Sequence, residues 1–96
     1  SQYPAVEHDL AIVVDNTVTC EDLERRITSA GGKLLEGVRL FDVYRDPIRI
    51  GAGKKSMAFA LTYRSDDHTL TSEEVEKAHQ KIVTKVCKGV NGEVRG

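Results

Sequence analysis

The segment from Lys55 to Arg64 alternates strictly between large apolar and small side chains, and this alternation constrains the fold more than any other feature of the chain. The large residues are Met57, Phe59, Leu61 and Tyr63, and the small ones are Ser56, Ala58, Ala60 and Thr62. A period of two places successive side chains on opposite faces of a strand. The segment is therefore predicted to be a strand with one buried face and one face of small residues.

Three further segments alternate in the same way: residues 6–14, residues 35–44 and the tail at 90–95. We predict a strand in each. The residues expected to pack beneath the helices are Leu10, Ile12, Phe41, Val43, Met57, Phe59, Leu61 and Val94. Between the second and third strands, residues 45–54 contain one proline and two glycines and form a loop too long for a tight turn.

Two helices are predicted between the strands. Thr19 to Asp22 and Thr71 to Glu74 both have the form of a capping box, in which a hydroxyl and an acid satisfy free backbone donors. Apolar residues then recur at helical spacing, at Leu23, Ile27 and Ala30 in the first helix and at Val75, Ala78, Ile82 and Val86 in the second. We expect the first helix to end at Gly31-Gly32 and the second at Lys88-Gly89.

The resulting order is β-α-β-β-α-β, the split βαβ or ferredoxin-like pattern of the α+β class. Right-handed crossovers place both helices on one face of a four-stranded antiparallel sheet and leave the other face open. The 96 residues fit one domain, residues 1–96. The open face is therefore where we expect recognition to occur.

The open face is predicted to carry Asp42 and Tyr44 beside the small side chains of the third strand. An exposed aromatic ring over small residues can stack a nucleobase, which contributes roughly 1 to 3 kcal/mol per base. A nearby carboxylate can accept hydrogen bonds from a base. The cations of the adjoining loop could contact phosphates around a stacked base; they are Arg45, Arg49, Lys54 and Lys55.

Other kinds of function have little support. A net charge of -1 gives no domain-wide field for a polyanion. Gly51 to Ser56 faintly resembles a phosphate-binding loop but leads into a strand rather than a helix. The acidic residues of the open face have no desolvated pocket to tune them for catalysis, and no metal site is expected from the separated Cys20 and Cys87. No apolar run reaches membrane-spanning length, and no signal-peptide pattern is present.

The chain resembles the ferredoxin-fold anticodon-binding domain that ends the β subunit of bacterial phenylalanyl-tRNA synthetase. The resemblance is carried by YPAVEHDLAIVV, LLEGVRLFDVY, GKKSMAFALTY, HTLTSEEVEKAHQKIV and GEVRG, and it covers nearly the whole chain. It implies a fragment of a longer cytoplasmic chain in an α2β2 ligase that uses ATP and magnesium, although this domain itself would hold no cofactor. The domain would hold the anticodon of tRNA(Phe), whose first base is a guanine.

The resemblance also implies roles for four residues. Tyr44 would stack the first anticodon base with Asp42 beside it, and Ser56 and Arg95 match positions that contact the anticodon. Many relatives have two basic residues in the first strand where this chain has Glu7-His8. We therefore expect the isolated domain to bind tRNA weakly.

Two other functions remain open at this point: a small-molecule regulatory module of the same topology, and a purely structural docking domain. A single-chain organellar synthetase carries a related terminal domain, so the assignment to a bacterial β subunit depends on the detail of the motifs.

Overall fold

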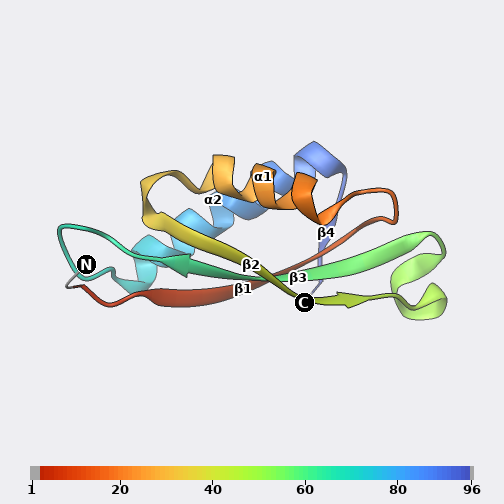
Figure 1. The fold of residues 1–96 in the computed structure, drawn as a ribbon, viewed down its shortest axis with the longest axis horizontal. Helices are drawn as coiled ribbons and strands as arrows, with labels where there is room; N and C mark the ends of the chain where they lie inside the picture. Colours follow the sequence, from red (N-terminus) through yellow and green to blue (C-terminus); the bar gives the residue numbers. More distant parts are fainter. Residues whose placement is uncertain (1–2, 96) are drawn as a thin grey trace.

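The computed structural model describes residues 3–95, which form an antiparallel four-stranded sheet with two helices on one of its faces (Figure 1). The strands and α-helices are β1 (Val6–Asp15), α1 (Cys20–Gly31), β2 (Leu35–Tyr44), β3 (Lys54–Tyr63), α2 (Ser72–Val90) and β4 (Glu93–Val94), and two short helical turns, Gly32–Leu34 and Pro47–Gly51, precede β2 and β3. The strand order is β2-β3-β1-β4. This order confirms the predicted ferredoxin-like α+β fold.

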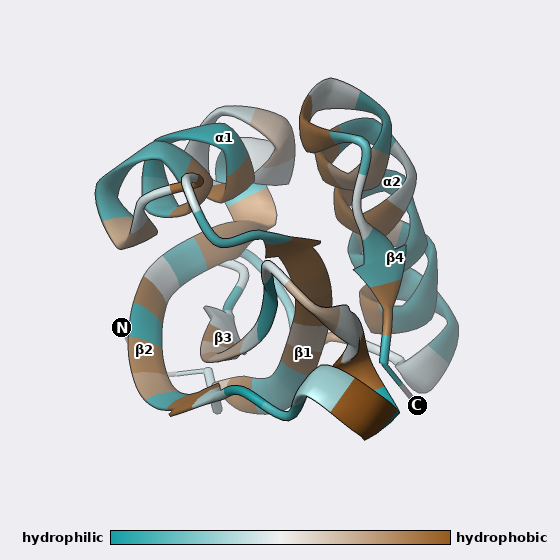
Figure 2. Ribbon diagram, turned by 90° about the vertical axis from the view of Figure 1, so that its right-hand side faces the viewer, coloured by the Kyte–Doolittle hydropathy of each residue, from teal (hydrophilic) through white to brown (hydrophobic). Residues whose placement is uncertain are grey.

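The core lies between the sheet and the two helices. Its largest fully buried side chains on the strands are Ile12, Val14, Phe59, Leu61 and Tyr63, and those on the helices are Leu23, Ile27, Ile82 and Val86. The apolar sides of both helices face the sheet (Figure 2). The large side chains of β3 are thus buried, as the alternation predicts.

Strand β2 departs from the predicted alternation. Leu40 pairs with Phe59 and Asp42 with Ala58, so Phe41 is an additional residue in a β-bulge. The prediction that Phe41 and Val43 pack beneath the helices is wrong, because their exposed fractions are 49 % and 38 %. As the extra residue of the bulge, Phe41 no longer falls on the side of the strand that faces the core. The end of the β2–β3 hairpin also projects beyond the helices that would cover these residues (Figure 1).

The chain after α2 also differs from the prediction. The helix continues through Gly89 to Val90 and ends at Asn91, whose φ of 54° lies in the left-handed region that asparagine tolerates. The predicted tail strand shortens to Glu93–Val94, and Val94 is 49 % exposed rather than buried. Gly89 lies inside the helix, where an added Cβ would meet only Nη1 at the flexible end of the Arg26 side chain, 2.6 Å away.

The helix starts follow the sequence closely. At α2 the Thr71 hydroxyl accepts from the Glu74 amide, and the Glu74 carboxylate accepts from the Thr71 amide, which completes the predicted capping box. At α1 the Thr19 hydroxyl accepts from the Asp22 amide. The Asp22 carboxylate binds Arg25 and Arg26 instead of the Thr19 backbone N–H, so the capping box predicted for α1 is wrong in its second half.

Candidate nucleic-acid interface

The register of the sheet places four predicted site residues on the face away from the helices. Tyr44 lies opposite Ser56, and Asp42 lies opposite Ala58. Arg95 follows β4 and donates its backbone N–H to the carbonyl of Ala11. The sequence predicted this side of the sheet for Asp42 and Tyr44. Because Phe41 forms a bulge, the alternation that places them there begins at Asp42 and does not continue from the residues before the bulge.

Tyr44 is fixed by contacts on two sides. Its hydroxyl donates to Asp46 Oδ2 at 2.9 Å, and the guanidinium of Arg95 lies 4.6 Å from the centre of its ring. Tyr44 belongs to β2, whereas Arg95 follows β4 at the other edge of the sheet. The two side chains therefore meet above β3 and β1 and bridge the open face.

Ser56 lies within the row that these side chains span. It is only 3 % exposed, although neither α1 nor α2 covers this face. Its cross-strand neighbours are Tyr44 on β2 and Val13 on β1, and Val13 pairs in turn with Glu93. A ligand that contacts the Ser56 hydroxyl therefore requires the surrounding side chains to move apart.

Asp46 is part of this site and was not singled out from the sequence. Its Oδ1 accepts from the backbone N–H groups of Ile48 and Arg49, each at 3.0 Å, and so begins the helical turn Pro47–Gly51. These bonds and the bond from Tyr44 lower the pKa of Asp46, while the bond to Asp46 raises the pKa of Tyr44. The signal that could have found it is the Asp-Pro pair, which is typical of such a turn.

The loop cations separate into different environments. Lys54 is exposed beside Val13 and Glu93, near the rim of the open face. Lys55 has the opposite parity, pairs with Val14 and is 8 % exposed, so the structure does not bring it to the Tyr44 face. Arg45 donates to Asn16 Oδ1 at 3.1 Å, which ties the end of β2 to the turn after β1.

Glu7 and His8, the adjacent pair in β1, also lie on different faces of the sheet. Glu7 is exposed and pairs with Thr62, on the open-face parity. His8 lies on the helix side, where its ring stacks on that of His79 at 3.7 Å between centroids. The first of these positions therefore adds a negative charge to the open face rather than a phosphate-binding cation.

Within residues 3–95, no group of three or more His, Cys, Asp or Glu side chains could hold a metal ion. Cys20 and Cys87 are free, half-buried thiols, and burial raises the pKa of Cys20 to about 11. No helix in the described part of the chain has both the length and the apolar character needed to cross a membrane.

The fold and this face define a ferredoxin-like α+β domain that presents an aromatic ring, a carboxylate and a guanidinium on its uncovered side. Residues 1–95 match the family model of the ferredoxin-fold anticodon binding domain, and the chain belongs to that family.

Curated relatives agree with this assignment, and each of the three described here is named phenylalanine–tRNA ligase beta subunit. The relative from Clostridium tetani is 45 % identical over 98 % of this chain, and that from Symbiobacterium thermophilum is 47 % identical over 98 %. The relative from Bacillus subtilis is 51 % identical over 85 % of this chain. The matched regions span 12 %, 10 % and 10 % of these relatives, so the chain corresponds to a small part of each.

Proposed function

We propose that this domain binds the anticodon of tRNA(Phe) on the open face of its sheet, with the first anticodon base stacked on Tyr44. The observation that carries the proposal is the position of the Tyr44 ring, which lies on the face opposite α1 and α2 and already contacts a planar cation at 4.6 Å. Aromatic side chains on such a face are the usual platform for unpaired bases.

The contact between Tyr44 and Arg95 suggests how the base enters. Stacked rings lie about 3.4 Å apart, so a base between the two groups needs a separation of roughly 7 Å. Arg95 lies on the exposed segment after β4 and can move more readily than Tyr44, which Asp46 holds. In the bound state the base lies between the ring and the guanidinium, which replaces one cation–π contact by two stacking contacts.

Asp42 supplies specificity in this proposal. It is exposed one pleat from Tyr44, on the same parity. A carboxylate accepts hydrogen bonds from the amino and imino groups of guanine, whereas adenine and the pyrimidines present different donors. Ser56 becomes available once Arg95 moves, and Lys54 and Arg45 lie where phosphates flanking the base could pass.

The domain is proposed to act within a longer β subunit that pairs with an α subunit in an α2β2 phenylalanine–tRNA ligase. ATP and magnesium would be used by that enzyme in the cytoplasm, at a site outside these residues. This domain would supply binding energy for tRNA and no chemistry, so its loss should affect the use of tRNA rather than the activation of phenylalanine.

The test is Tyr44→Ala in the ligase that contains this domain. We expect the KM for tRNA to rise roughly 5- to 150-fold, which corresponds to the loss of one stacked base, while kcat changes little. Tyr44→Phe is the matched control, because it keeps the ring and removes only the hydroxyl, and its KM should stay within about threefold of the parent.

A second measurement separates stacking from a general loss of structure. An anticodon stem-loop with guanine at the first anticodon position is compared with one that carries cytosine there. The parent domain should prefer guanine, and Asp42→Asn should reduce that preference more than it reduces overall binding. Equal KM values for Tyr44→Ala and the parent would contradict the proposal.

A further inference from the structure

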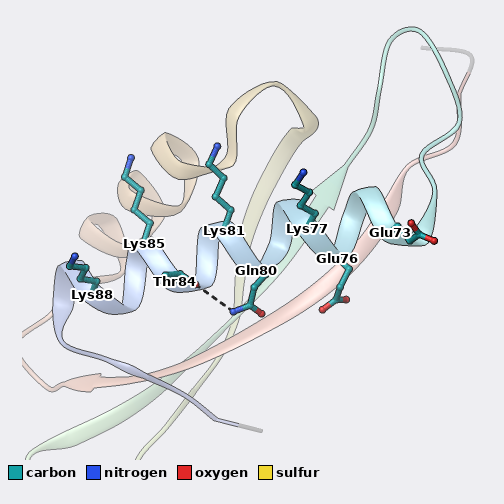
Figure 3. Close-up of a pocket in the computed structure, with 8 residues that line it drawn as sticks. All are labelled: Glu73, Glu76, Lys77, Gln80, Lys81, Thr84, Lys85 and Lys88. Carbon is teal, nitrogen blue, oxygen red and sulfur yellow. Dashed lines mark hydrogen bonds between the residues drawn. The ribbon is translucent and has the colours of Figure 1, made fainter.

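The outer side of α2 carries a row of four lysines on the opposite side of the molecule from Tyr44. The row consists of Lys77, Lys81, Lys85 and Lys88, and all four are exposed (Figure 3). They project from one side of the helix, whereas Glu76 and Gln80 project from the other. Residues 77–91 contain no Asp or Glu. The row is therefore a local concentration of positive charge in a chain of net charge -1.

Cations of α1 and of the following turn extend this row into a surface. Arg25 and Arg26 line a groove together with Lys85. Lys33 lines another with Lys77 and Lys81, and Glu74 is the one acidic residue among the described residues of that groove. Both arginines form ion pairs with the same carboxylate, that of Asp22, so the three side chains together keep a net positive charge. Within residues 3–95 the four lysines of α2 form no ion pair with any acidic group.

We propose that this lysine surface binds the phosphate backbone of double-helical RNA, without reading its bases. The inference goes beyond the anticodon proposal, because it concerns the helix side of the domain and a different structural form of RNA. It depends on charge and spacing alone and would stand if Tyr44 bound no base.

The spacing of the lysines fits a regular polyanion. Lys77, Lys81 and Lys85 are each four residues apart, which is about 6 Å along a helix that rises 1.5 Å per residue. The full row of four spans about 16 Å. Lysine ammonium groups are compact charges on flexible stems, so they suit repeated phosphates that need no fixed hydrogen-bond geometry.

A protein partner fits this surface less well. Its residues along α2 are all polar or charged, with no aromatic or large apolar side chain to form a buried anchor. Lysine is also depleted in protein interfaces relative to the rest of the surface. A membrane surface would require an exposed apolar side on α2, but Val75, Ile82 and Val86 are buried in the core.

Helix stability alone does not account for the row. Cations in the last turn of a helix are favoured by its dipole, and this applies to Lys88. Lys77 and Lys81 lie earlier, where the dipole gives little benefit. Glu73 stands four residues before Lys77, yet no ion pair joins them among the residues that the structure describes. The first half of the row is therefore better explained by an external partner.

The experiment measures binding of the 96-residue chain to a fluorescent RNA duplex of mixed sequence by anisotropy, over a range of salt concentrations. The test variant is Lys81→Gln with Lys85→Gln. Each lysine that contacts a phosphate should contribute close to one unit to the slope of log K against log salt. We expect the double variant to bind roughly tenfold more weakly at about 0.1 M salt and to lose nearly two units of slope.

Lys81→Arg with Lys85→Arg is the matched control, since it keeps both charges, and it should bind the duplex as the parent does. Tyr44→Ala should also leave duplex binding unchanged, which distinguishes failure of this inference from failure of the anticodon proposal. An unchanged affinity and salt slope in the glutamine variant would overturn the inference. So would binding of polyglutamate or of anionic lipid vesicles at least as tight as binding of the duplex.

Discussion

At the scale of single residues, Tyr44 is positioned by its own chain before a ligand is present. Asp46 accepts three hydrogen bonds, one from the Tyr44 hydroxyl and two from the turn that follows. The same carboxylate thus fixes the ring and the loop beside it. Preorganisation of this kind reduces the entropy lost when a base stacks on the ring.

We predict that Asp46→Ala lowers the pKa of Tyr44 toward the ordinary value of a tyrosine, because the bond to Asp46 is the main cause of its increase. Site-resolved NMR titration of the tyrosine rings measures this change. Asp42→Ala is the control, since Asp42 makes no hydrogen bond to the Tyr44 hydroxyl among the described residues. A Tyr44 pKa that is unaffected by Asp46→Ala would show that the bond is not formed in solution.

Parity predicted the side of the sheet for Asp42 and Tyr44 but not for Phe41. Alternation is a local rule, and a bulge adds one residue that the rule does not anticipate. The residues after the bulge kept the expected side because Asp42 pairs with Ala58 on the small-residue face. Contacts such as that of Arg95 with Tyr44 could not be predicted, because they depend on how far the twisted sheet brings its two edges together.

At the scale of elements, the start of α2 is defined by a reciprocal pair of hydrogen bonds between Thr71 and Glu74. We predict that Thr71→Ala lowers the free energy of unfolding by about 1 kcal/mol, the usual cost of a lost N-cap. Thr71→Ser keeps the hydroxyl and should cost much less. Urea unfolding followed by circular dichroism measures both, and equal losses in the two variants would rule out the capping bond as the cause.

A buried contact between α2 and the sheet should make stability depend on pH. His79 Nδ1 lies 2.9 Å from the Tyr63 hydroxyl, and its ring stacks on His8 of β1 near Glu76. Burial lowers the pKa of His79, and the charge of His8 adds to the decrease. The unfolded chain therefore takes up a proton near pH 6.5 where the folded chain does not. Stability should be highest above that pH and fall as pH decreases.

A second histidine acts in the opposite direction. Hydrogen bonds to Glu74 and Asp67 raise the pKa of His68, so its contribution is present below about pH 6.5 and is lost as pH rises. His68 is exposed, which reduces its effect. Comparing unfolding at pH 7.5 and 5.5, we expect the loss on acidification to shrink in His79→Gln and to increase in His68→Gln. The reverse pattern would refute the assignment.

The ends of the helices show which sequence signals were sufficient to predict where a helix begins or ends. Helix starts have local chemical markers, and both were predicted to the residue at Thr19 and Thr71. The end of α2 was predicted too early, because Gly89 was interpreted as a terminator. The helix ends instead at Asn91, whose backbone adopts the left-handed conformation that glycine more often supplies at this position.

At the scale of the whole molecule, the fold separates two charged surfaces that the net charge of -1 conceals. The sheet side combines Tyr44, Asp42 and Arg95, whereas the helix side carries the lysine surface. Composition suggested that no field would attract a polyanion. The arrangement of α2 concentrates its cations on one side, so local charge and not net charge decides what each surface can bind.

Two phenylalanines provide a test of how the core holds this arrangement together. Phe59 is fully buried at the centre of β3, whereas Phe41 is 49 % exposed at the bulge of β2. Removing a buried phenylalanine side chain costs about 3 to 5 kcal/mol, because apolar contacts are lost and a cavity remains. Phe59→Ala should therefore remove much of the total stability of a domain of this size, which is about 5 to 15 kcal/mol.

Phe41→Ala makes the same chemical change at the exposed position, and it should cost about 1 kcal/mol or less. Urea unfolding of both variants gives the two free energies directly. The contrast also bears on function, since a variant that loses only the exposed ring should retain the register of Asp42 and Tyr44. If Phe41→Ala proved as destabilising as Phe59→Ala, the ring would have to be buried, β2 would follow the unbroken alternation, and the pairing of Asp42 with Ala58 would be incorrect.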